Sequence, residues 1–105
     1  MNLQKTPPNR MQKLLRGANG MSCIRCGKEG ETRACHYNGI RQMQFGKGRG
    51  IKCDDLMTAE FCHQCDSDFT EGSTKLWNNC IQRSEEFLYH VCQTNIRRVR
   101  RGDLK

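Results

Sequence analysis

Two short cysteine motifs constrain this chain more than any other feature. Cys23 and Cys26 form one Cys-x-x-Cys pair, and Cys62 and Cys65 form a second, with 35 residues between the pairs. A Cys-x-x-Cys turn brings two sulfurs close enough to bind one ion, and two such turns complete a tetrahedral shell that leaves no position for water. The spacing therefore predicts one closed, structural zinc site formed by these four cysteines.

The size of the chain makes such a site important for folding. At 105 residues, of which 35% are hydrophobic, the sequence predicts one domain with a small apolar core. A chain this short has a marginal folding free energy unless a metal or disulfides stabilise it. We therefore expect metal binding to supply a large part of the free energy of folding.

The eight cysteines indicate either metal or disulfides. The N-terminus has no apolar stretch typical of a signal peptide, and no segment is apolar for long enough to span a membrane. We therefore expect a cytoplasmic, reducing location, where paired cysteines usually bind zinc. Disulfides remain the alternative. Cys35 and Cys53 could pair with each other or assist a second metal, but we expect them to be free thiols without a role in metal binding. Cys80 and Cys92 are expected in the apolar core.

The net charge of +7 is unevenly distributed. Residues 1–16 are basic without any acidic residue, and the Pro7-Pro8 pair disfavours a helix there. The sequence thus predicts a flexible N-terminal arm over 1–16, in which 11–16 could form a turn of helix, and a single zinc-containing domain over 17–105. A polyanion suits separate basic clusters, since each neutralised phosphate releases counterions. A solvated basic face is the alternative reading.

The expected nucleic-acid contacts come from a glycine-rich loop and from the C-terminal basic stretch. They are Arg41, Lys47, Arg49, Lys52, Arg97, Arg98, Arg100 and Arg101.

Secondary structure is expected to change from strands to helix after the second cysteine pair. Short strands are predicted at 32–37 and near 56–61, with an irregular, mobile loop over 38–51. Apolar residues then recur at spacings of three and four, which predicts one long helix from about 74 to 101, or two helices that break near Asn78-Asn79. The residues of the expected apolar face are Trp77, Cys80, Ile81, Ser84, Phe87, Leu88, Val91 and Cys92.

One segment carries a more specific signal. Residues 46–66 read Gly-Lys-Gly-Arg-Gly-Ile-Lys-Cys-Asp-Asp-Leu-Met-Thr-Ala-Glu-Phe-Cys-His-Gln-Cys-Asp. This string resembles the core of the small YbcO-like nucleases of lambdoid phages and prophages, which are related to HNH (His-Me finger) endonucleases. The similarity extends over about residues 15–105 and includes Ala34-Cys35-His36 and the C-terminal helix.

The resemblance implies a small α+β fold: a zinc-stapled ββα-metal finger, in which a β-hairpin and a helix are clamped by the four-cysteine site, with a long C-terminal helix. It also implies a metal-dependent endonuclease that hydrolyses DNA phosphodiester bonds in the cytoplasm of a phage's host. By position, His36 takes a proton from the attacking water. Asp55, or alternatively Asp54, orients that histidine or its loop, and Asp66 holds the catalytic Mg²⁺ or Mn²⁺.

The sequence departs from the family pattern at two positions. Asp66 stands where the family has a histidine, and Cys35 stands where many HNH enzymes have an Asp or His ligand. Two alternatives therefore stay open: a non-catalytic zinc module that binds DNA, and a phage protein that captures a host protein on its apolar helix face. His36 could instead be a buried histidine, Asp54-Asp55 a solvated turn and Asp66 a helix cap. No oligomeric state is indicated.

Overall fold

Two short antiparallel strands form the centre of the fold. β1 (Arg33–His36) pairs with β2 (Thr58–Phe61), with Arg33 opposite Phe61 and His36 opposite Thr58. The computed structural model describes residues 8–48, 50–70 and 79–104. The remaining elements are α1 (Gln12–Gly17), η1 (Ala18–Gly20), η2 (Gln42–Phe45), α2 (His63–Thr70) and α3 (Cys80–Arg100).

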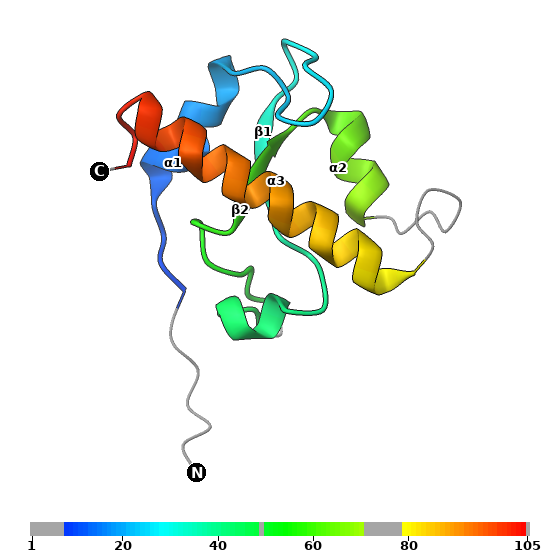
Figure 1. Ribbon diagram of the computed structural model, residues 1–105. Coiled ribbons are helices and arrows are strands. Elements are labelled where there is room, and N and C mark those ends of the chain that lie inside the picture. Colours follow the sequence, from blue (N-terminus) through cyan, green and yellow to red (C-terminus); the bar gives the residue numbers. More distant parts are fainter. Residues whose placement is uncertain (1–7, 49, 71–78, 105) are drawn as a thin grey trace.

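The helices surround this small sheet (Figure 1). α1 and η1 pack against β1, whereas α2 and α3 pack against β2. The prediction of a small α+β fold with a long C-terminal helix is confirmed, and α2 follows β2 directly, which gives a strand–strand–helix order. The loop expected over 38–51 contains the short helix η2. No described helix has the length and apolar character needed to cross a membrane.

Aromatic rings from three elements form the centre of the core. Phe61 of β2 stacks on Phe69 of α2 with ring centroids 5.0 Å apart, and Phe87 of α3 lies 5.1 Å from Phe69. Tyr37, which follows β1, contacts Phe87 edge-on at 5.4 Å. These large side chains bury much apolar area in a chain with few hydrophobic residues.

α3 begins where a side chain caps it. Asn79 has an extended backbone, and its side chain accepts a hydrogen bond of 2.8 Å from the Gln82 N–H group. A helix start near 74 and Trp77 lie outside the described residues. The buried side chains of α3 are Ser84, Phe87, His90, Val91, Thr94 and Arg98.

The predicted apolar face of this helix is partly wrong. Cys80 and Cys92 are exposed rather than in the core. Ile81 is exposed as well. The buried stripe instead ends in Thr94 and Arg98, because the facing strand presents a carboxylate rather than an apolar side chain.

That carboxylate belongs to Glu60, which is fully buried on β2. Its Oε1 accepts a hydrogen bond of 2.8 Å from Arg97 and its Oε2 one of 2.5 Å from Arg101, while Arg98 Nε lies 3.7 Å from Oε2. Burial alone would raise the pKa of Glu60, but the hydrogen bonds from Arg101 and Arg97 lower it below its ordinary value. Three arginines of α3 and its C-terminus are thus bound to one buried carboxylate.

This network corrects the expected nucleic-acid contacts at the C-terminus. Arg98 is 0% exposed and cannot reach a ligand in solvent. The side chains of Arg97 and Arg101 are largely buried as well, at 21% and 18% exposure, and both bind Glu60. Of the four arginines, only Arg100 is exposed.

The N-terminal segment is packed rather than free from residue 9 onward. Asn9 donates two hydrogen bonds to Asp54, and the Met11 N–H group donates one of 2.7 Å to Asp55. Arg10 binds the carbonyl groups of Lys52 and Cys53. α1 then buries Leu14 completely. The arm expected over 1–16 therefore does not extend past residue 8, and residues 1–7 lie outside the described part.

Arg10→Ala is expected to lower the free energy of unfolding by about 1 kcal/mol. Arg10 donates hydrogen bonds to two carbonyl groups and to Asp55, but its side chain is 46% exposed, so solvent weakens these bonds. Urea denaturation of the metal-loaded protein measures the difference. Arg16→Ala is the matched control, because Arg16 is an exposed arginine of the neighbouring helix. Equal stability of the two variants would contradict the packing role of Arg10.

Candidate functional site

The four cysteines of the two motifs lie together. The Sγ atoms of Cys23, Cys26, Cys62 and Cys65 are all within 4.8 Å of one another, and Cys26 Sγ is 3.6 Å from Cys62 Sγ. Tetrahedral zinc with Zn–S bonds of about 2.3 Å separates its sulfurs by about 3.8 Å. The cluster can therefore hold a metal ion such as zinc. Among the described residues, no other group of three or more His, Cys, Asp or Glu side chains is close enough to do so.

Two different local structures present these sulfurs. In the first motif, the Cys23 N–H group donates to Lys28 O at 2.8 Å and the Gly27 N–H group donates to Cys23 O at 2.9 Å. This tight turn requires φ of +82° at Gly27, which a residue without Cβ adopts at little cost. In the second motif, Cys62 lies between β2 and α2, and Cys65 lies in the first turn of α2.

The turns are also attached to each other away from the sulfurs. The Ile24 N–H group donates to Glu60 O at 2.8 Å, which joins the first turn to β2. Arg25 binds Asp68 of α2 at 2.8 Å, and its guanidinium lies 5.0 Å from the centre of the Phe69 ring. These contacts between protein groups hold the two motifs next to each other.

The electrostatics of the cluster favour a bound cation. Burial opposes ionisation of Cys23, but the backbone N–H groups of Cys26 and Cys62 lower its pKa to about 7. Burial raises the pKa of Cys62 and of Cys65. A positive ion is therefore needed to hold all four as thiolates. All eight cysteines lie in the described part, and none of them forms a disulfide.

A histidine–carboxylate pair lies at the C-terminal end of β1. Nε2 of His36 is 2.7 Å from Oδ1 of Asp55. Asp55 is 2% exposed and also binds Arg10 and the Met11 N–H group. Burial opposes its ionisation, yet the hydrogen bonds from His36 and from Met11 lower the pKa of Asp55. The predicted partnership of His36 with Asp55 is thus present in the structure, whereas Asp54 binds Asn9 instead.

His36 lines a cleft of about 470 Å³ that also contains Asp66 of α2. Lys47 and Lys52 line the same cleft. Asp55 is behind His36 and does not line it. The cleft therefore brings together an imidazole, a carboxylate and two ammonium groups that are far apart in the sequence.

Asp66 does not cap a helix. α2 begins at His63, so Asp66 is in its first turn, and its own N–H group donates to Cys62 O at 3.0 Å. Cys35 lies beside the Asp66 carboxylate. Burial is the main cause, and the charge of Asp66 the second, that raise the pKa of the Cys35 thiol to about 12. Cys35 is therefore a neutral thiol at physiological pH, and Asp66 is the anionic group of the cleft.

A second cleft of about 680 Å³ adjoins the first. Both are lined by Arg33, Cys35 and Asp66, so they form neighbouring parts of one groove. His63, between the two cysteines of the second motif, is exposed and lines this second part. Arg33 was not among the residues expected to bind nucleic acid. Its place on a strand, two residues before Cys35, is the signal that puts the two on one face of the sheet.

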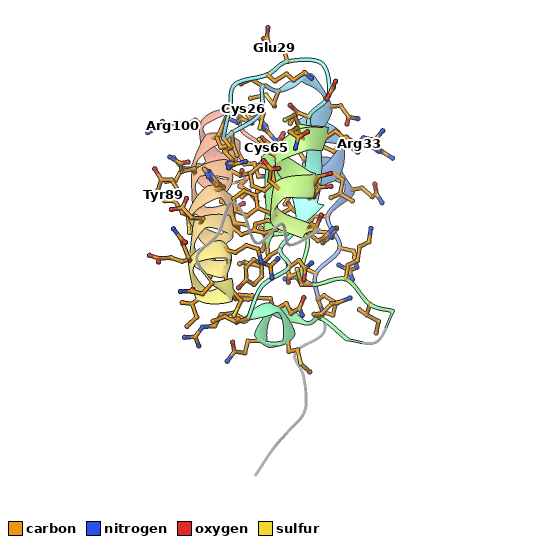
Figure 2. The ribbon with its side chains drawn as sticks, turned by 90° about the vertical axis from the view of Figure 1, so that its right-hand side faces the viewer. Cys26, Glu29, Arg33, Cys65, Tyr89 and Arg100 are labelled. Atoms are coloured by element: carbon orange, nitrogen blue, oxygen red, sulfur yellow. The ribbon has the colours of Figure 1, made fainter. Side chains whose placement is uncertain are left out.

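The remaining basic residues expected to bind nucleic acid are dispersed. Arg41 is exposed near the start of η2, and Arg49 lies outside the described residues. Figure 2 shows Arg100 and Tyr89 on the outer side of α3, with Arg33 on the opposite side of the molecule. Only Lys47 and Lys52 of the expected set line the cleft of His36.

Comparison with known proteins identifies no relative. No protein-family model matches the chain, and neither curated proteins nor solved structures give a match.

Proposed function

We propose that this protein is a metal-dependent endonuclease of the His-Me finger type that hydrolyses DNA phosphodiester bonds. The observation that carries the proposal is the cleft that His36 and Asp66 both line. Nε2 of His36 is 2.7 Å from Oδ1 of Asp55, which holds the ring in place. The strand–strand–helix order supports it, since the histidine ends the first strand and the carboxylate lies in the first turn of the helix.

His36 suits the role of general base. When Nε2–H donates to the ionised Asp55, the hydrogen bond fixes the tautomer in which Nδ1 carries the free lone pair. Nδ1 then accepts the proton of a water molecule that attacks the phosphorus atom. Asp55 positions the ring and stabilises the imidazolium that forms, and it does not contact the substrate.

Asp66 provides the ligand for a catalytic cation. Mg²⁺ is usually bound by one or two carboxylates, with waters and substrate phosphates completing its shell, so a single protein carboxylate fits this ion. Bound there, Mg²⁺ or Mn²⁺ would neutralise the charge that develops on the phosphate and the leaving oxygen. The neutral Cys35 thiol beside Asp66 is not required as a ligand.

The lysines of the cleft account for binding of the polyanion. Lys47 and Lys52 come from the loop before β2, opposite Asp66 of α2. Arg33, which lines both parts of the groove, extends the positive lining toward His63. Phosphate contacts of this kind give affinity without sequence preference and weaken as salt rises.

Cleavage of supercoiled plasmid and of single-stranded and branched oligonucleotides tests the proposal. The zinc-loaded protein is expected to cut at least one of them with Mg²⁺ or Mn²⁺, and His36→Ala is expected to lower the rate by about a hundredfold. Gln44→Ala is the control and should cut normally, since Gln44 is exposed and lines neither part of the groove. Zinc content and thermal melting of both variants are measured to exclude unfolding.

A nucleic-acid-binding module without catalysis is the second candidate function. The observation in its favour is that, among the described residues, Asp66 is the one acidic side chain that lines the His36 cleft, beside two lysines and an arginine. Salt-sensitive DNA binding that survives His36→Ala, with every DNA form left intact under every divalent ion, would support this module and refute the endonuclease.

A further inference from the structure

α3 exposes an apolar stripe that its own domain does not cover. Tyr89, Ile96 and Val99 are 54%, 52% and 55% exposed, and Cys92 between them is exposed as well. Their spacings of three, four and three residues match the core positions of a coiled-coil heptad. At 3.6 residues per turn they fall within an arc of about 80°. We call these four residues the outer stripe.

The outer stripe faces away from the domain core and from the cleft. The side chains that α3 buries against β2, among them Phe87, Val91 and Arg98, lie on another face of the helix. In Figure 2, Tyr89 projects from the outer side of α3, with Arg33 of the groove on the opposite side of the molecule. A partner seated on the outer stripe would therefore leave the groove open.

The charges beside the outer stripe identify which partner fits. Glu86 and Arg100 flank it on one edge, two heptads apart, with Gln93 midway between them. The side chain of Glu86 is 48% exposed, and Arg100 is exposed. In a parallel pair each flanking residue faces the opposite edge of the other helix, so a second, parallel copy would place Glu86 beside Ile81 and Arg100 beside Asn95, without an ion pair. An antiparallel copy would place each Glu86 against Arg100 of the other copy.

We propose that α3 mediates a homodimer in which the two α3 helices pack antiparallel through the outer stripe. Tyr89 then packs against Val99 of the second copy, and Cys92 packs against Ile96 of the second copy, each twice around the two-fold axis. Glu86 and Arg100 form two ion pairs at the ends, and Gln93 meets its own equivalent near the axis. The surface is self-complementary in shape and in charge.

This proposal does not rest on the proposed nuclease activity. It assigns Arg100 to a carboxylate of the second copy instead of to DNA, and it places the two grooves on the outer sides of the dimer. Cys92 lies near the axis but does not face its own equivalent across the seam, so the association does not require a disulfide.

Charge reversal tests the dimer and its antiparallel register together. In reducing buffer of low ionic strength, sedimentation equilibrium of the zinc-loaded protein is expected to show a dimer. Glu86→Arg and Arg100→Glu should each raise the dimer dissociation constant by about tenfold or more, because each places two like-charge pairs in the interface. An equimolar mixture of the two variants should associate as tightly as the wild type, since every pair across the seam is then attractive.

Three outcomes would overturn the proposal. The first is a wild-type monomer at the highest concentration reached. The second is that both single variants dimerise like the wild type. The third is that their mixture stays monomeric, which excludes the antiparallel pairing. Ile96→Glu, with zinc content and thermal melting as folding controls, must also abolish the dimer. If Arg100→Glu weakens DNA binding while leaving the dimer unchanged, Arg100 is a nucleic-acid contact and the interface is wrong.

Discussion

Removal of the bound metal is expected to unfold the whole domain. The four thiol groups come from two motifs that are far apart in the chain, and without a cation burial keeps Cys62 and Cys65 protonated, so nothing joins the four sulfurs. Zinc binding to comparable sites contributes about 10–16 kcal/mol, whereas the total stability of a small domain is about 5–15 kcal/mol. Excess chelator should therefore abolish the helical circular dichroism signal and the cooperative thermal transition, and added zinc should restore both.

Single substitutions separate the metal site from the other thiols. Cys65→Ser removes a ligand and is expected to give a protein that is unfolded at 37 °C, with less than one zinc per chain by elemental analysis. Cys80→Ser is the matched control, because Cys80 is an exposed thiol outside the cluster and outside the outer stripe, and it should bind one zinc and melt like the wild type. A chelated protein that keeps its helical signal and its cooperative melting would refute the structural role of the metal.

The same site connects the fold to the proposed chemistry. Asp66 follows Cys65 directly in α2, so the residue that would hold the catalytic cation is attached to a residue of the four-cysteine cluster by one peptide bond. Cys62 directly follows β2, which pairs with β1, and β1 carries His36. A metal ion in the cluster would thus fix the distance between the two sides of the cleft, and its loss should end any cleavage as well as folding.

The features that the sequence predicted well depend on short-range patterns. Two Cys-x-x-Cys motifs require a small set of turns around one ion, whatever the rest of the fold is. The strand near 32–37 and the long C-terminal helix follow from local periodicity. The neighbourhood of His36 and Asp55 followed from the resemblance to a nuclease family, since nothing in their local sequence indicates that residues 19 positions apart share a hydrogen bond.

The features that were missed depend on long-range pairing of charges. An arginine-rich C-terminus has the same local pattern whether it faces solvent or a buried carboxylate. Glu60 is 37 to 41 residues from the arginines that it binds, and its strand neighbours gave no sign that it is buried. The N-terminal segment was misjudged for the same reason, because Asp54 and Asp55, which hold it, are about as distant in sequence.

The apolar face of α3 shows how a buried ion pair changes which residues of a helix lie in the core. Ile96 and Val99 are more hydrophobic than Thr94 and Arg98, so periodicity alone places the former pair in the core. In the structure Thr94 is fully buried and its Oγ1 accepts a hydrogen bond from the Glu60 N–H group, and Arg98 donates to Thr58 Oγ1. These polar groups are buried because they bind one another, and the apolar pair is left exposed.

Glu60→Gln is expected to lower the free energy of unfolding by about 3–5 kcal/mol, the usual cost of breaking a buried ion pair on one side. The amide keeps the shape of the side chain but not its charge, and Arg98, which is 0% exposed, would be left without a counterion. Burial lowers the pKa of Arg98, and the charge of Glu60 opposes that shift. Glu85→Gln, an exposed position on α3, is the control and should change stability little.

The pH dependence of the difference in unfolding free energy between the wild type and Glu60→Gln provides an independent check. The pKa of Glu60 is lower in the folded protein than its ordinary value of 4.5, so the folded state binds fewer protons than the unfolded state near that pH. The contribution of Glu60 is therefore complete above pH 4.5 and is lost as the pH falls through the folded-state pKa. Urea denaturation of the wild type and Glu60→Gln should give a constant difference near neutrality that shrinks in acid. A difference that is already absent at neutral pH would show that Glu60 does not hold the three arginines.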